Sequence, residues 1–119
     1  MNVLVVDDQA PFRSVARTLV SITPGLDFVA EAESGEQAVE LAEELHPPVI
    51  LMDINLPGIS GIEATRQIRA NDPSVRVVLM STYAAADLPA DAMDSGAIGY
   101  LRKEDITPDA LLNLLNGAA

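Results

Sequence analysis

The sequence lacks cysteine and tryptophan, and aromatic residues make up only 3% of its 119 positions. Without thiols the chain can form neither disulfides nor thiolate metal sites, and thiol catalysis is excluded. Basic residues are also scarce: 7 lysines and arginines stand against 18 aspartates and glutamates, which gives a formal net charge of −11. Because phosphate contacts need a basic face, this balance argues against direct binding of nucleic acid. No apolar run approaches the roughly 20 residues of a membrane span.

The residues that are present favour a folded chain, because 49% of them are hydrophobic despite the high charge. We expect residues 1–119 to form one domain, since a chain of this length can bury about two-thirds of its unfolded surface in one core. Met1 leads almost directly into an apolar run at residues 3–6, which leaves no room for a signal peptide. We therefore expect a cytoplasmic protein with no membrane association.

Two kinds of segment alternate along the chain. Short apolar runs predict buried strands at residues 3–6, 49–52 and 75–80, with weaker candidates at 26–32 and 99–101. Apolar residues at helical spacing begin near Pro11, follow a capping box at residues 34–37, and continue over 62–70, 88–95 and 108–116. Pro89 falls inside the fourth of these helices, so we expect that helix to start late or to be short.

Five strand–helix units in this length indicate an α/β fold in which an open parallel sheet carries helices on both faces, a doubly wound three-layer sandwich. Polar residues follow several of the strands: Asp7 and Asp8, then Asp53, then Ser81, and finally Lys103. The carboxyl ends of parallel strands share one edge, where such sheets bind their ligands. We therefore expect these side chains to lie together.

The chemistry of this group points to a cation and a phosphoryl group. Clustered carboxylates repel one another unless a cation joins them. With oxygen ligands only, the cation best suited is Mg²⁺ with several retained waters. A carboxylate beside Mg²⁺ can attack a phosphoryl group, and Lys103 and Ser81 could donate to the phosphoryl oxygens. Taken singly, Asp7 or Asp8 could instead cap the first helix, Asp53 could be a turn residue, and Lys103 could be solvated.

At this point the sequence resembles the receiver domain of two-component response regulators, over essentially its whole length. The carriers of the resemblance are residues 3–8 (Val-Leu-Val-Val-Asp-Asp), residues 51–61, Ser81 and residues 96–103. The resemblance implies a flavodoxin-like (βα)5 fold with the strand order 2-1-3-4-5. It also implies a magnesium site in which Asp8 and Asp53 are ligands, Asp7 acts through water, and the backbone carbonyl of Asn55 completes the set.

The same resemblance implies a role for each remaining residue of the pocket. Asp53 matches the phosphoacceptor, Ser81 the switch hydroxyl, Tyr100 the switch aromatic residue, and Lys103 the phosphate-binding lysine. The implied protein is a signalling switch rather than an enzyme, although it assists its own phosphorylation and dephosphorylation. A histidine kinase or phosphotransfer protein, or a small phosphodonor, supplies the phosphoryl group. The face formed by the fourth helix, fifth strand and fifth helix then changes its affinity for a partner.

The sequence departs from many receivers after Lys103, where Glu104 and Asp105 stand in place of a proline. This variant is common in receivers fused to LuxR-type helix-turn-helix output domains, so we expect a DNA-binding domain outside this chain. A stand-alone receiver remains the alternative, and a homodimer is left open. A magnesium-dependent aspartyl-nucleophile phosphatase is disfavoured, because Asp53 follows the third strand and no cap insertion is present. A flavin domain is disfavoured because Asp7 and Asp8 would repel its phosphate.

Three further expectations concern single side chains. Arg13 and Arg17 form an i, i+4 pair that we expect on the solvated face of the first helix, with a kinase-docking role as the alternative. Met80 and Met93 are expected in the core. Glu36 is expected on the solvated face of the second helix.

Overall fold

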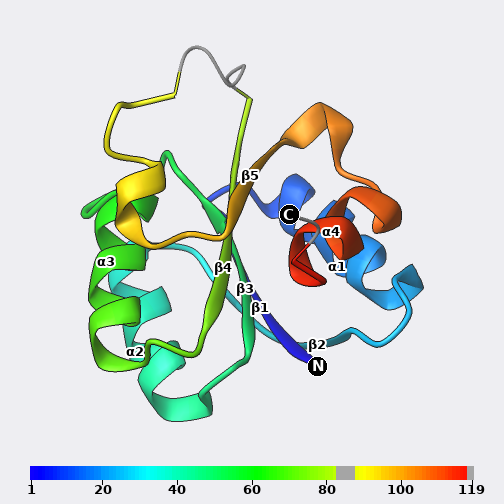
Figure 1. Cartoon of the computed structure of the whole chain (residues 1–119), viewed down its shortest axis with the longest axis horizontal. Coiled ribbons are helices and arrows are strands. Elements are labelled where there is room, and N and C mark those ends of the chain that lie inside the picture. Colours follow the sequence, from blue (N-terminus) through cyan, green and yellow to red (C-terminus); the bar gives the residue numbers. More distant parts are fainter. Residues whose placement is uncertain (83–87, 118–119) are drawn as a thin grey trace.

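The structure is a computed structural model that describes residues 1–82 and 88–117, and its centre is a five-stranded sheet (Figure 1). All neighbouring strands run parallel, in the order β2-β1-β3-β4-β5. The predicted α/β fold and strand order are confirmed. The strands are β1 (Asn2–Val6), β2 (Asp27–Ala32), β3 (Val49–Asp53), β4 (Arg76–Ser81) and β5 (Gly99–Arg102).

Four α-helices cover the two faces of the sheet in the described residues. Helices α1 (Ala10–Ile22) and α4 (Pro108–Leu115) lie on one face, and α2 (Gly35–Leu45) and α3 (Gly61–Asn71) lie on the other (Figure 1). In this labelling α4 is the helix that follows β5, and not the helix predicted at residues 88–95. None of the helices within residues 1–82 and 88–117 is long and apolar enough to cross a membrane.

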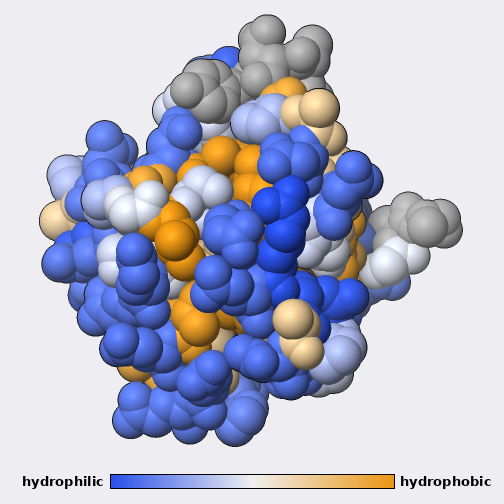
Figure 2. Space-filling model, turned by 90° about the vertical axis from the view of Figure 1, so that its left-hand side faces the viewer, coloured by the Kyte–Doolittle hydropathy of each residue, from blue (hydrophilic) through white to orange (hydrophobic). Residues whose placement is uncertain are grey.

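The alternation of side chains along each central strand produces two cores. Val3 and Val5 pack with α1 and α4, whereas Leu4 and Val6 pack with α2 and α3. Because both faces of β1 are covered, four consecutive apolar residues are needed there, and all four are fully buried. The outer face of α2 and α3 is mainly hydrophilic, with apolar side chains in the groove between the helices (Figure 2).

Local signals set most of the helix boundaries. Ser34, Ser60 and Thr107 each precede a helix and accept a hydrogen bond from the backbone N–H three residues later. Helix α2 ends at His46, which adopts a left-handed conformation (φ 47°) and donates its backbone N–H to the carbonyl of Ala42. Helix α1 has no side-chain cap; Pro11 lies in its first turn, where a missing N–H costs no intrahelical bond.

The helix predicted at residues 88–95 starts late and is short, as expected from Pro89. Only Met93–Ser95 is helical, as a short 3-10 turn called η2, and residues 83–87 lie outside the described residues. Pro89 has no N–H to donate, and hydrogen bonds of the i→i+3 type connect Ala92 to Pro89 and Ser95 to Ala92. The short turn leaves Met93 half exposed rather than in the core, where the prediction put it, and Ala92 is buried instead. Met80 is fully buried, as predicted.

Candidate functional site

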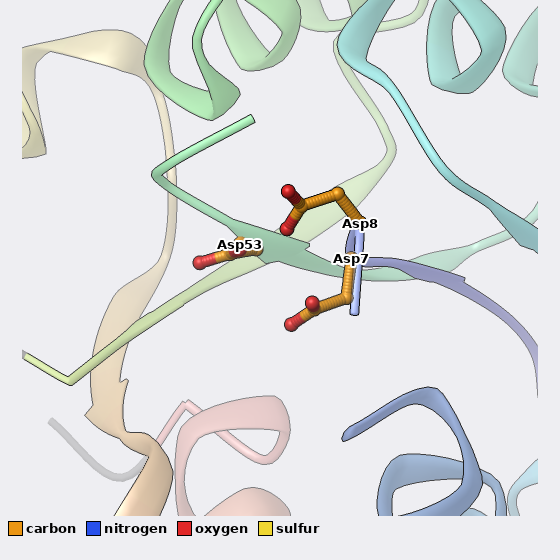
Figure 3. Close-up of side chains that lie close together, drawn as sticks. All are labelled: Asp7, Asp8 and Asp53. Carbon is orange, nitrogen blue, oxygen red and sulfur yellow. The ribbon is translucent and has the colours of Figure 1, made fainter. Parts of the chain in front are cut away.

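Three carboxylates meet where β1 and β3 end. Val6 pairs with Met52, so Asp7 and Asp53, which come next along the chain, reach the same edge of the sheet. Asp53 in turn pairs with Met80 on β4. One oxygen from each of Asp7, Asp8 and Asp53 lies within 4.8 Å of the others (Figure 3). Asp7 is fully buried and Asp53 is 4% exposed, whereas Asp8 is exposed.

Lys103 brings a positive charge into this group. It follows β5 at the start of a 3-10 turn, η3 (Lys103–Asp105), and its Nζ donates to Oδ2 of Asp7 at 2.6 Å. The same Nζ lies 3.5 Å from Oδ2 of Asp53. On another side it lies 4.4 Å from the centre of the Phe12 ring, a cation–π contact. Phe12 belongs to the apolar pattern that begins near Pro11, and nothing in that pattern indicates that its ring contacts the site.

Every polar atom of Asp7, in the backbone and in the side chain, has a hydrogen-bond partner. Its N–H donates to the carbonyl of Ala32, its Oδ1 accepts from the N–H of Gln9 at 2.8 Å, and its carbonyl accepts from Arg13. Helix α1 begins after Gln9 with no side-chain capping bond. The alternative in which Asp7 or Asp8 caps this helix is therefore wrong: the capping position is Gln9, and the carboxylate of Asp7 accepts from Gln9 itself, before the first helical residue.

The expected position of Arg13 on a solvated helix face is also wrong. Its side chain is only 11% exposed, and its guanidinium points toward the sheet, where the Asp7 carbonyl and Glu33 accept from it. Arg17, one turn later, is exposed as predicted and donates to Glu31 at 2.7 Å. The two arginines therefore lie on the same side of α1, where both contact Glu31, but only Arg13 is buried.

The pKa of Asp53 is raised from 3.8 to about 6. Burial is the largest cause, and the negative charge of Asp7 adds to it. The ammonium of Lys103 and the backbone N–H of Asn55 act in the opposite direction but do not compensate. Three carboxylates share the single ammonium of Lys103 at this site, which favours the entry of a further cation.

We predict that ionisation of Asp53 destabilises the metal-free domain. The folded state retains the proton between pH 3.8 and about 6, so the free energy of unfolding falls as the pH rises through this window. The loss is at most about 3 kcal/mol for a shift of this size. Urea unfolding in EDTA, followed by circular dichroism, measures it. Asp53→Asn should be more stable than the unmodified protein by about 1–2 kcal/mol above about pH 7. An unchanged pH profile in this variant would contradict the assigned shift.

A glycine and a glutamate shape the loop after β3. A Cβ on Gly61 would lie 1.9 Å from the carbonyl oxygen of Asp53, so only glycine allows α3 to begin so close to the site. Glu36 accepts a hydrogen bond from the N–H of Ile59 at 3.2 Å. Glu36 is exposed, as predicted for the solvated face of α2, and it also holds the loop that carries Asn55.

Ser81 lies at the end of β4 and Tyr100 on the neighbouring strand β5. Ser81 ends β4 and is buried, and its residue pairs with Arg102 across the sheet. The hydroxyl of Tyr100 donates to the Ser81 carbonyl at 3.3 Å. Burial raises the pKa of this phenol. The predicted switch residues Ser81 and Tyr100 are therefore in contact, and Tyr100 lies on β5, the strand that leads to Lys103.

A pocket of about 200 Å³, open to the solvent, lies beside Asp8, Asp53 and Lys103. Its volume leaves room for a cation and a small polar group, and the carboxylate oxygens that face it are hard ligands suited to Mg²⁺. The lining residues are Asp8, Gln9, Asp53, Asn55, Thr82 and Lys103.

Comparison with known proteins agrees with this geometry. Residues 3–116 match the family model described as response regulator receiver domain. The chain is 37% identical to the transcriptional regulatory protein DegU of Brevibacillus brevis over 119 residues, which are all of this chain and 50% of that protein. It is 39% identical to the nitrate/nitrite response regulator protein NarL of Escherichia coli K12 over 118 residues, 99% of this chain and 54% of NarL. The chain therefore spans about half the length of these relatives.

Solved structures give the same result. A LuxR-family two-component response regulator from Aurantimonas sp. SI85-9A1 superposes with a TM-score of 0.86 and 33% identity, over 98% of this chain and 83% of that one. The signal receiver domain of the NarL-type regulator from Mycobacterium tuberculosis has a TM-score of 0.86 and 31% identity, over 98% and 96% of the two chains. The fold, the acidic pocket and these likenesses together lead to one conclusion: the chain belongs to the response regulator receiver domain family.

Proposed function

We propose that this receiver domain is a phosphorylation-dependent switch in which Asp53 accepts a phosphoryl group from a histidine kinase or phosphotransfer protein. The observation that carries the proposal is the position of Asp53. Its carboxylate is buried at the end of β3, borders the pocket, and has Asp7, Asp8 and Lys103 around it. The domain acts as a phosphoacceptor and not as an enzyme with an independent substrate.

Mg²⁺ is the cation that this site would take. Asp8, Asp53 and the backbone carbonyl of Asn55 would hold it directly, and Asp7, whose oxygens accept from Lys103 and Gln9, would act through a bound water. When bound, the ion neutralises the carboxylates and draws charge from the phosphoryl oxygens. The burial of Asp53 and the nearby charge of Asp7, which together raise the pKa of Asp53, support such a ligand.

The transfer uses the ionised carboxylate of Asp53 as the nucleophile. One of its oxygens attacks phosphorus, an O–P bond forms, and the P–N bond to the donor histidine breaks. The imidazole leaves with the electron pair of that bond and takes up a proton. Lys103 is placed to donate to the arriving phosphoryl oxygens, because its Nζ is 3.5 Å from Asp53.

The response to phosphorylation starts at Ser81. Its hydroxyl would turn to the phosphoryl group, and Tyr100, which donates to the Ser81 carbonyl, would move with it. These residues belong to β4 and β5, so the change in their positions would reach the surface formed by η2, β5 and α4. Phosphorylation shifts the population toward the state that gives the phosphoryl group more hydrogen bonds.

The output of the switch is a separate domain. The curated relatives are about twice as long as this chain, and one is described as a transcriptional regulatory protein. A helix-turn-helix domain that follows the receiver is therefore the partner that we infer, and it would contact DNA in place of this acidic domain. The surface near β5 and α4 could also pair two receivers as a homodimer.

The test is phosphorylation of the purified domain by a small acyl phosphate. We expect one phosphoryl group per chain by intact mass with Mg²⁺, and none when EDTA replaces the metal. Hydroxylamine should remove the group, because it cleaves acyl phosphates. Incorporation that does not depend on Mg²⁺ and survives hydroxylamine would contradict the proposal.

A further inference from the structure

A buried arginine, Arg13, contacts the backbone of the acidic site. Arg13 lies in the first turns of α1 and is 9% exposed, although it carries a full charge. One terminal nitrogen of its guanidinium donates to the carbonyl of Asp7 at 2.8 Å, in a buried hydrogen bond. The other terminal nitrogen donates to Oε1 of Glu33 at 3.3 Å, and Nε lies 3.5 Å from Oε1 of Glu31. Arginine therefore connects the end of β1 with β2 and the residue that follows it.

The contact with the Asp7 carbonyl has a consequence for Asp8. That carbonyl belongs to the peptide unit that joins Asp7 to Asp8, and a planar peptide unit turns as one body. In residues 1–82 and 88–117 no hydrogen bond or ion pair holds the carboxylate of Asp8. The direction in which this side chain leaves the backbone depends on its peptide units, and Arg13 holds one of them.

We propose that Arg13 is a positioning residue for Mg²⁺ binding: it fixes the Asp7–Asp8 peptide unit so that Asp8 faces Asp53 across the pocket. This inference rests on the proposed magnesium site. Arginine suits the task because its planar guanidinium can donate in two directions at once, which lysine cannot do with the same geometry. Groups that orient metal ligands without touching the metal typically contribute a factor of about 10–100 to metal affinity.

Because Arg13 is charged, the direction of the change in Mg²⁺ affinity distinguishes a positioning role from simple repulsion. A cation near the site repels Mg²⁺, so removal of its charge alone should strengthen metal binding. Loss of a positioning contact should weaken it. Arg17 provides the matched control, because it also pairs with Glu31 but is exposed and makes no contact with Asp7.

The experiment is titration of the whole domain with MgCl₂ in a calorimeter, for the unmodified protein and for Arg13→Met, Arg13→Lys and Arg17→Met. We expect Arg13→Met to weaken Mg²⁺ binding about tenfold or more. Arg13→Lys, which keeps the charge, should also bind more weakly than the unmodified protein. Arg17→Met should bind as tightly as the unmodified protein or slightly more tightly. Far-ultraviolet circular dichroism checks that each variant is folded.

Each outcome decides one question. If Arg13→Met and Arg13→Lys are folded and bind Mg²⁺ as tightly as the unmodified protein, the positioning role is refuted while the magnesium site stands. If Arg13→Met does not fold, Arg13→Lys decides by the same criterion. An equal loss of affinity in Arg17→Met would also refute it, because the effect would then not depend on Asp7. If the unmodified domain binds no Mg²⁺, the proposed magnesium site itself is wrong.

Discussion

Asp53→Asn should lose all phosphoryl incorporation from a small acyl phosphate while remaining folded. Asparagine keeps the shape of the side chain but has no anionic oxygen to attack phosphorus. The substitution also removes an unfavourable buried charge, since the pKa of Asp53 is raised to about 6 by burial and by Asp7. Loss of phosphorylation should thus be accompanied by a gain in stability, which separates a chemical defect from a folding defect.

Intact-mass spectrometry with Mg²⁺ measures incorporation in this variant. Asp27→Asn is the matched control, because Asp27 is an exposed carboxylate at the opposite end of the sheet, where β2 begins. This control should be phosphorylated as well as the unmodified protein. A phosphoryl group on Asp53→Asn that hydroxylamine removes would mean that another carboxylate is the acceptor, with Asp8 as the nearest exposed candidate.

Lys103→Met is expected to produce the largest loss of stability among the variants considered. The methionine keeps the apolar stem against Phe12 but leaves the carboxylates of Asp7 and Asp53 without their ammonium. Removal of one partner from a buried ion pair typically costs about 3–5 kcal/mol. We therefore expect a loss of about 3 kcal/mol at neutral pH in EDTA, measured by urea unfolding.

The pH and metal dependence of this loss identify its cause. Without the ammonium the pKa of Asp53 rises further, so acidification toward pH 5 protonates it and should narrow the difference from the unmodified protein. Saturating Mg²⁺ should narrow it as well. Arg102→Met is the control: this neighbouring cation pairs with Glu104 at the surface and should change stability by less than about 1 kcal/mol. A loss that is the same at all pH values and metal concentrations would indicate a packing defect instead.

The comparison of sequence and structure shows where residue patterns are informative. Apolar runs predicted the central strands β1, β3 and β4 within one residue of the observed bounds, because a strand covered on both faces must be apolar throughout. The edge strands β2 and β5, which are only partly buried, gave a weaker signal. Capping residues such as Ser34 act within one turn and were found directly. In the helix predicted over residues 88–95, Pro89 indicated a late start or a short helix, and only Met93–Ser95 is helical.

The site divides in the same way. The end of a strand is a local property, so the sequence alone determined that Asp7, Asp53 and Lys103 would reach one edge of a parallel sheet. Only the tertiary structure decided which partners they have there. Lys103 meets Asp7 across 96 positions of the chain, and Phe12 covers its ammonium. The contact with Phe12 depends on how α1 is turned against the sheet, which a repeat of 3.6 residues constrains only to a broad face. Arg13 and Arg17 have the same spacing pattern, yet packing buries the first against Asp7 and leaves the second in water.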